Sequence, residues 1–319
     1  MREASTLERE LFIRYGSAAS EAMFDYPCNF FQIPDCLGYI SYRVEFKCAI
    51  IIGDPICPIS ELEALTYAFH QYCHGAGLKI IYVIVSEKFA RFVQQYCPIL
   101  IEVCEELIFD PQLNQIFKSN RLHHRVEKAI QHGLTFHEYI PFDNEIENGI
   151  AELSNKWLKG KKGLGLHLGH LNFFETHLGK RWFYVKDGNT ITSMAMLSQI
   201  GSQKGWLLKF FITDPSAFHD TSEFMMASVL TLLKKENCSF LTKGSQPVDY
   251  LSEINGLKYS APFVKFVYKM VSIIFKFKKR KEYWKRYQSK KERSYLLLSS
   301  SNIGISEIRA LMKVFKMHY

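Results

Sequence analysis

The chain has 319 residues, of which 47% are hydrophobic and 23% are charged, with 40 Lys plus Arg against 32 Asp plus Glu. This composition excludes a disordered or collagen-like chain, and the length allows two domains that each bury a core. No run reaches about 18 uninterrupted apolar residues, so we expect no membrane-spanning helix in this sequence.

The cysteines and the first residues predict a cytoplasmic protein. Seven of the eight cysteines fall within the first 104 residues, mostly in apolar runs, and no CxxC pair occurs. This pattern is typical of reduced core thiols. The opening segment MREASTLEREL contains acidic side chains and no apolar stretch of the kind found in signal peptides, so we do not expect export.

The first third of the chain predicts alternating strands and helices. Apolar runs and turn residues indicate two strands over 38–52, a helix over 60–75, a buried strand over 79–85 and a helix that begins at Ser86. Ser60 and Glu63 have the spacing of a capping box. The first strand pair ends in Gly53, Asp54 and Pro55, which places a carboxylate directly after a buried strand.

A basic helix is expected over 116–132, and Gly133 ends it. Its apolar residues recur at helical spacing, and three cations, Arg121, Arg125 and Lys128, lie off that face on adjacent turns. A strand over 134–140 and Pro141 close this half. We therefore predict a first domain over residues 1–142 and a second over 143–319.

The second half repeats the alternation. Asp143 can cap a helix whose apolar stripe is formed by Ile146, Ile150, Leu153 and Trp157. An antiparallel meander is expected over 181–212, followed by a helix over 220–236 and a strand over 238–244.

The positive charge is concentrated near the end of the chain. Residues 276–293 contain ten basic and two acidic side chains, so this segment alone carries +8, which equals the formal net charge of the chain. Three aromatic residues, Tyr283, Trp284 and Tyr287, are interleaved with the cations. The pattern suits nucleic acid or an anionic lipid surface. The alternative is a solvated helix face whose aromatic residues pack on the core.

Several motifs in this order resemble one family. They are GYISYRV followed by IIGDP, the pair Glu105 and Glu106 before a strand, NRLHHRVEKAIQHGLTF, LSNKWLKGKKGLGLHLG, and FKKRKEYWKRYQSKKERSYL. From about Gly38 to Leu298 the chain resembles the catalytic domain of phosphatidylglycerol lysyltransferases, the DUF2156 group of aminoacyl-tRNA-dependent lipid aminoacyltransferases.

The resemblance implies an α/β (α+β) fold with two tandem GNAT-like (acyl-CoA N-acyltransferase-like) domains and mixed sheets. It also implies a transferase that moves an aminoacyl group from aminoacyl-tRNA to phosphatidylglycerol or a comparable acceptor. The tRNA-borne amino acid and the lipid would meet between or near the domains. The expected partners are aminoacyl-tRNA and an anionic phospholipid or membrane surface, and the expected location is the cytoplasm, peripheral at the inner face of the membrane.

We expect no cofactor, because the Gly-rich pyrophosphate loop of acetyl-CoA enzymes is missing from the sequence. We also expect no metal, although His70, Cys73 and His74 could share one helix turn, because no second ligand cluster stands out. Two other functions stay open. One is an N-acyltransferase that uses acyl-CoA, and the other is a non-catalytic tandem domain that binds tRNA or membrane.

Three residues are candidate catalytic groups: Asp54, Glu223 and Arg286. Asp54 either orients a substrate amine or satisfies the amides of its own turn. Glu223 either binds the ammonium of the aminoacyl group or forms a capping box with Asp220. The resemblance aligns Ser222 and Glu223 with a Met-Asp pair, and the longer Glu predicts a smaller amino acid than lysine. Arg286 falls where the family carries a cation, which would bind a phosphate.

The candidate substrate-binding residues are Arg121, Arg125, Lys128, Trp157, Lys243, Lys278 and Tyr287. The three cations of the basic helix would contact successive phosphates of a tRNA acceptor stem, unless they form a solvated helix face. Lys243 begins the run Lys-Gly-Ser-Gln-Pro, where the family has Gly-Met-Ala-Pro-Leu near its amino acid pocket. Lys278 and Tyr287 belong to the basic segment, and Trp157 to the motif LSNKWLKG.

Overall fold

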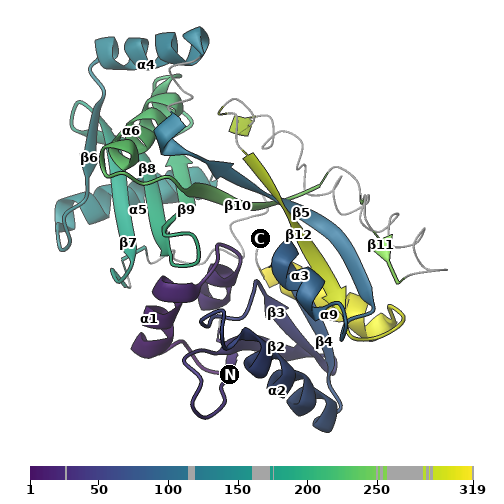
Figure 1. The fold of residues 1–319 in the computed structure, drawn as a ribbon. Helices are drawn as coiled ribbons and strands as arrows, with labels where there is room; N and C mark the ends of the chain where they lie inside the picture. The colour runs from purple at the N-terminus through teal and green to yellow at the C-terminus, as the bar shows by residue number, and fades with distance from the viewer. Residues whose placement is uncertain are drawn as a thin grey trace. The chain divides into compact units, whose positions relative to one another are not determined.

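The computed structural model describes residues 1–25, 27–113, 119–159, 173–174, 176–248, 251, 254–256, 283–284, 287 and 290–317 (Figure 1). The chain divides into two compact units. Unit 1 comprises Met1–Ile108, Ile200–Gln203 and Gly244–His318, and unit 2 comprises Phe109–Gln199 and Lys204–Lys243. The predicted boundary between residues 142 and 143 falls inside unit 2. This unit includes residues before the boundary because the strand over Thr135–Glu138 pairs with the strand over Lys180–Asp187.

Unit 1 contains a mixed sheet in which the strand order is β1-β2-β3-β4-β12-β5. Its strands are β1 (Asn29–Phe31), β2 (Ile40–Glu45), β3 (Cys48–Ile52), β4 (Lys79–Ser86), β5 (Ile99–Phe109) and β12 (Lys290–Leu298), with β11 (Ile254–Asn255) paired to β5. Its helices are α1 (Thr6–Tyr15), the 3-10 helix η1 (Ser20–Asp25), α2 (Leu62–Gly75), α3 (Glu87–Val93) and α9 (Ile305–Met317). Strands β3 and β4 are parallel, and β12 is antiparallel to both β4 and β5.

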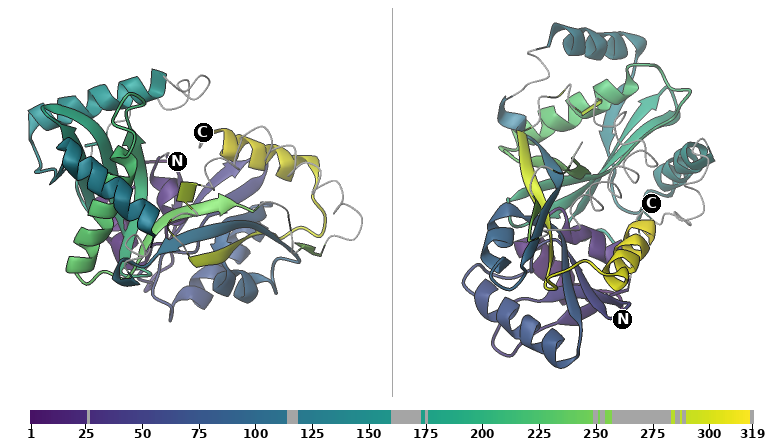
Figure 2. Two further views of the ribbon diagram at one scale, coloured as in Figure 1. Left: turned by 90° about the horizontal axis from the view of Figure 1, so that it is seen from above. Right: turned by 90° about the vertical axis from the view of Figure 1, so that its right-hand side faces the viewer.

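Helices cover both faces of this sheet (Figure 2). Alternate residues of β3 and β4 point to opposite faces, so Ile51 and Tyr82 pack with Phe69 of α2, whereas Ile50 and Ile81 pack in the cluster that contains Ala310 of α9. Strands buried on both faces read as continuous apolar runs, which explains the sequences CAIII and KIIYVIV.

The predicted caps in unit 1 have different outcomes. The helix expected to begin at Ser86 is α3, which begins at Glu87, and the Ser86 Oγ caps it by accepting a hydrogen bond from the Phe89 N–H at 3.2 Å. The capping box at Ser60 and Glu63 was wrong. A turn from Pro58 delays the start of α2 to Leu62, and the side chain of Glu61, its N-cap residue, makes no cap hydrogen bond.

Unit 2 contains a mixed sheet in which the strand order is β10-β9-β8-β7-β6. Its strands are β6 (Thr135–Glu138), β7 (Lys180–Asp187), β8 (Thr190–Ile200), β9 (Gly205–Thr213) and β10 (Leu241–Pro247), of which β10 ends in residues of unit 1. Its helices are the 3-10 helix η2 (Pro111–Leu113), α4 (Asn120–His132), α5 (Asn144–Lys159) and α6 (Thr221–Lys235). Strand β9 is parallel to β10, whereas β7 is antiparallel to β6 and β8.

The helices expected in unit 2 are present, but the basic helix expected over 116–132 begins at Asn120, because Ser119 has an extended backbone and caps it. The apolar stripe of α5 packs in a core cluster with residues of β7 and β8, and Gly133 ends α4 with a left-handed φ of 96°. Both units thus have the mixed α/β architecture expected for tandem GNAT-like domains. Within the described residues, no helix combines the length and apolar character needed to cross a membrane.

Candidate functional site

A cavity of about 850 Å³ opens in unit 1, and all of its lining residues belong to that unit. It lies at the carboxyl ends of the parallel strands β3 and β4, where Asp54 follows one strand and Ser86 ends the other. Residues 291–294 of β12 also line it. Ligands of α/β proteins commonly bind at the carboxyl ends of parallel strands, so this edge is the first candidate site.

Asp54 is held by Ser86. The Ser86 N–H donates to Asp54 Oδ1 at 2.9 Å, and the Ser86 hydroxyl donates to Oδ2 at 2.6 Å. Burial raises the pKa of Asp54, and these two hydrogen bonds oppose the shift without cancelling it. The carboxylate is therefore a stronger base than an exposed aspartate, and it lines the cavity.

The turn before Asp54 requires glycine. Gly53 has a φ of 77°, its N–H donates to the Val83 carbonyl at 2.9 Å, and a Cβ there would lie 2.5 Å from the backbone nitrogen of Ser20. The Ser20 hydroxyl also donates to the Asp54 carbonyl at 3.2 Å. The Asp54 carboxylate thus accepts hydrogen bonds from Ser86 at the start of α3, and not from the amides of its own turn, and it lines the cavity.

The cavity has a mixed charge lining. Its cations are Arg14, Lys88, Lys291 and Arg293, and its acidic residues are Asp54, Glu87, Glu106 and Glu292. Lys291 Nζ lies 2.8 Å from both carboxylate oxygens of Glu105. The Glu105–Glu106 pair lies within β5, opposite β12, and not before a strand as predicted.

Lys291 and Arg293 were missed as site residues by the sequence analysis. The sequence contained a signal for them, because the basic segment continues into the strand β12, in which Lys291 and Arg293 alternate and share one face. Pairing with β4 and β5 was needed to bring these two cations to the edge where Asp54 lies. Cations together with a basic carboxylate suit a ligand that carries both a phosphate and a hydroxyl.

A second charged group lies in unit 2, between α4 and α6. Arg125 Nη1 lies 2.6 Å from Glu223 Oε1, and Arg125 Nε lies 3.6 Å from Asp220 Oδ1. Both carboxylates are buried and share this one guanidinium, while His219 Nε2 approaches Asp220 Oδ2 at 2.9 Å.

Asp220 does not cap α6 through its side chain. Both of its carboxylate oxygens are buried, and in the described part of the chain neither accepts a hydrogen bond. Burying a carboxylate is unfavourable unless a cation compensates for it, and here the Arg125 guanidinium and the His219 ring lie beside the Asp220 oxygens. The lack of a side-chain cap hydrogen bond from Asp220 gives no support to the alternative that Asp220 and Glu223 form a capping box.

The structure separates the three cations predicted to bind tRNA. Arg121 and Lys128 are exposed on α4, whereas Arg125 is partly buried by its contact with Glu223. Lys243 Nζ donates to the Leu208 carbonyl at 3.0 Å, and Trp157 is half-buried against the core of unit 2.

The basic segment is described only in part. Trp284 and Tyr287 are buried, with the Tyr287 hydroxyl 3.2 Å from that of Tyr283, which agrees with aromatic residues that pack on the protein. Lys278 and Arg286 lie outside the described residues. No group of three or more His, Cys, Asp or Glu within the described ranges is placed to hold a metal ion. Burial lowers the pKa of His70 to about 4, and its Nε2 lies 3.1 Å from the Tyr82 hydroxyl.

Comparison with known proteins identifies related sequences. Residues 11–298 match the family model described as phosphatidylglycerol lysyltransferase, C-terminal. A phosphatidylglycerol lysyltransferase of Staphylococcus aureus is 25% identical over 187 residues, which cover 56% of this chain and 22% of that protein. The chain therefore spans about a fifth of the length of this relative.

Two solved structures share the fold over nearly the whole chain. L-PGS from Bacillus licheniformis has a TM-score of 0.78 at 16% identity, covering 98% of this chain and 96% of that one. The C-terminal domain (DUF2156) of a proposed lysylphosphatidylglycerol synthetase from Agrobacterium fabrum has a TM-score of 0.77 at 16% identity, covering 97% and 95%. At this identity the likeness establishes the fold.

Proposed function

Because the chain belongs to the family of phosphatidylglycerol lysyltransferase C-terminal domains, we propose that it transfers an aminoacyl group to phosphatidylglycerol or a comparable lipid acceptor. The observation that carries this proposal is the family match over residues 11–298, which includes residues of both units. The proposed donor is aminoacyl-tRNA, and the proposed place of reaction is the inner surface of the membrane.

The chemistry of this transfer fits a site without a covalent nucleophile. The ester of an aminoacyl-tRNA is already activated, so the acceptor hydroxyl attacks the ester carbonyl carbon directly. A new C–O bond forms to the lipid, the C–O bond to the terminal ribose breaks, and the ribose oxygen takes up a proton. The protein must position both reactants, stabilise the developing oxyanion and accept the proton of the attacking hydroxyl.

In this proposal Asp54 accepts that proton. Its raised pKa and its position at the cavity support the role, and Ser86 fixes the orientation of the carboxylate through two hydrogen bonds. Lys291 and Arg293 line the same cavity and are proposed to bind the acceptor phosphate. The Lys291 ammonium is oriented by Glu105, and Arg293 Nη1 lies 3.9 Å from Glu102.

Glu223 and Asp220 are proposed to bind the ammonium of the transferred amino acid. The support is that these two buried carboxylates lie together at the start of α6, beside the Arg125 guanidinium, and that the Asp220 oxygens accept no hydrogen bond within the described residues. For the tRNA, the exposed cations Arg121 and Lys128 supply phosphate contacts on α4. The basic segment over 276–293 adds charge for tRNA or anionic lipid.

The test is a reconstituted reaction. The purified chain is mixed with phosphatidylglycerol and a panel of tRNAs charged with labelled amino acids, and the lipid extract is assayed for label. We expect label to enter the lipid and to be lost after RNase treatment. Saturable turnover of acyl-CoA without tRNA would replace the proposal with an N-acyltransferase. Binding of tRNA or vesicles without any transfer would leave a non-catalytic binding domain.

A further inference from the structure

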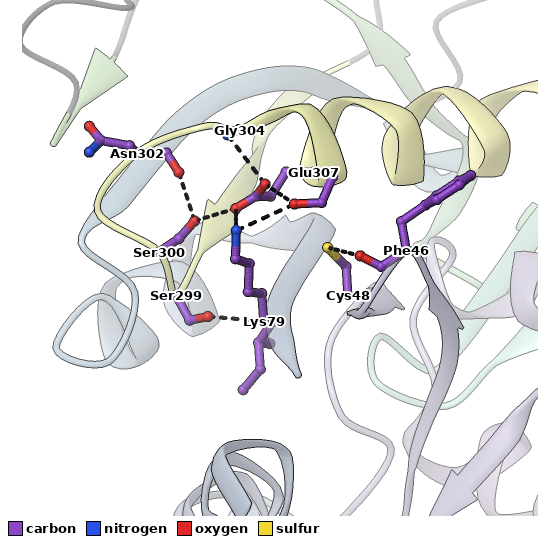
Figure 3. Close-up of polar contacts among 10 residues, drawn as sticks. Phe46, Cys48, Lys79, Ser299, Ser300, Asn302, Gly304 and Glu307 are labelled. Carbon is purple, nitrogen blue, oxygen red and sulfur yellow. Dashed lines mark hydrogen bonds and ion pairs between the residues drawn. The ribbon is translucent and has the colours of Figure 1, made fainter. Parts of the chain in front are cut away.

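A network of polar contacts fixes α9 on unit 1 (Figure 3). Glu307 is fully buried, and its carboxylate accepts hydrogen bonds from Lys79 at 2.8 Å, Ser300 at 3.0 Å, Ser306 at 2.6 Å and the Gly304 N–H at 3.2 Å. Burial alone would raise the pKa of Glu307, but Lys79 and the other donors outweigh it and lower the pKa to about 2. The first turn of α9 is therefore held in a defined orientation.

The outward face of α9 combines apolar and basic side chains. Ile305, Arg309, Met312 and Lys313 recur at positions i, i+4, i+7 and i+8, so they form one stripe along the helix. Ile305 is 76% exposed and Met312 is 53% exposed, whereas Ala310 is buried on the opposite side in the core of unit 1. The helix is thus anchored by one face and presents large apolar groups to solvent on the other.

The tip of the β2–β3 hairpin continues this stripe. Phe46 and Lys47 form a two-residue turn with φ values of 50° and 60°. Turns with two positive φ values favour Asn-Gly, and a bulky residue is disfavoured there. Phe46 is nevertheless 40% exposed, and the Arg309 guanidinium carbon and Lys313 Nζ lie 4.5 Å and 5.8 Å from its ring centroid.

We propose that this surface docks on an anionic lipid bilayer. The α9 surface consists of Phe46, Lys47, Ile305, Arg309, Met312 and Lys313. Its apolar side chains enter the boundary between headgroups and acyl chains, and its cations contact lipid phosphates. The inference deepens the proposed function by naming the surface that meets the membrane, and it rests on that function for the choice of lipid.

Two observations favour lipid over nucleic acid as the occupant. Ile305 and Met312 cannot stack on bases or donate hydrogen bonds, whereas burying their exposed area against an apolar phase is favourable. Glu307 is buried and bound by Lys79, and Glu45 is buried and pairs with Lys313 and Arg43. The exposed cations Lys47 and Arg309 therefore carry the positive charge that this surface presents to solvent. The surface therefore has the apolar and positive character expected at a membrane interface.

The test measures binding of the full chain to vesicles, without tRNA and without turnover. Vesicles contain phosphatidylglycerol and phosphatidylcholine, or phosphatidylcholine alone. We expect Phe46→Asn to weaken partition to the anionic vesicles about tenfold, while thermal stability is kept or increased because Asn tolerates the turn. Arg309→Gln should weaken it about fivefold and reduce its dependence on salt.

The matched control is Tyr67→Asn. Tyr67 is 52% exposed on α2, on the opposite face of the sheet, and this change should leave partition unchanged. Equal binding by all variants would overturn the proposal, and so would a loss of tRNA binding with unchanged vesicle binding. Aminoacyl transfer to detergent-dispersed lipid distinguishes the docking proposal from the proposed function. The docking variants should retain this transfer. If the unmodified chain shows no transfer, only the proposed function is contradicted.

Discussion

A buried carboxylate lies at each end of the parallel pair β3 and β4, and the pKa values of the two are shifted in opposite directions. At the carboxyl ends, Asp54 accepts hydrogen bonds from the neutral groups of Ser86 beside a cavity, and its pKa is raised. At the amino ends, Glu307 is enclosed by Lys79, hydroxyl groups and a backbone amide, and its pKa is lowered to about 2.

The difference indicates which end is built for chemistry and which for stability. Burial raises the pKa at both positions, so the partners decide the sign of the shift. A carboxylate with a lowered pKa stabilises the folded state when ionised. A carboxylate with a raised pKa destabilises it when ionised, and such a group is common at functional sites.

The largest effect is expected from Asp54→Asn. If Asp54 accepts the proton of the lipid hydroxyl, transfer should fall by about 100-fold or more. Thermal stability should stay the same or rise, because the raised pKa means that stability is lost as pH increases through the folded-state value. Transfer assays and thermal melts check this. The control Asp35→Asn changes an exposed residue and should alter neither activity nor stability. A melting temperature that falls together with activity in Asp54→Asn would mean that Asp54 has a structural role in its turn.

The next effect is expected from Glu223→Gln. Gln keeps an acceptor for Arg125 but removes the charge proposed to bind the substrate ammonium, so transfer should fall about 20-fold with little change in melting temperature. The same assay with a panel of charged tRNAs tests the preference for a small amino acid such as alanine or glycine. Nearly unchanged transfer would favour a structural role for Glu223, and a clear preference for lysyl-tRNA would contradict the size argument.

Glu307→Gln should lower stability by about 1 to 2 kcal/mol, because it removes the charge-assisted hydrogen bond with Lys79. In the unmodified chain the contribution of Glu307 is present above its ordinary pKa near 4.5 and is lost as pH falls toward about 2. Denaturant unfolding of both proteins at pH 7 and pH 3 measures the loss of stability in the variant and its dependence on pH. A variant as stable as the unmodified chain at pH 7 would mean that the network does not anchor α9.

The smallest effect concerns the three cations of α4. Single changes Arg121→Ala and Lys128→Ala should each reduce the salt slope of tRNA binding by about one unit. Arg125→Ala should instead lower stability, because it leaves Glu223 and Asp220 without their shared guanidinium. Binding titrations at several salt concentrations, combined with melts, distinguish these cases. Identical salt slopes for all three variants would mean that Arg125 contacts tRNA in the same way as Arg121 and Lys128, despite its ion pair with Glu223.

Local pattern was enough to predict most elements. Continuous apolar runs predicted β3 and β4, the stripe of α5 predicted its buried face, and Gly133 marked the end of α4. The same local rules failed at Ser60 and Glu63, because a turn beginning at Pro58 set the helix start. Unit 1 takes its residues from three separate stretches of the chain, which local rules do not detect.

The sequence by itself determined the fold class, the family resemblance and Asp54 as a carboxylate after a buried strand. The fold class follows from the family resemblance, which several motifs in the same order carry, and the apolar run before Gly53 marks the position of Asp54. Only the tertiary structure decided that Asp54 bonds to Ser86, that Lys291 and Arg293 share its cavity, and that Glu223 pairs with Arg125. These partners are distant in the chain, and the sign of each carboxylate's pKa shift depends on which of them strand pairing and helix packing bring within hydrogen-bond distance.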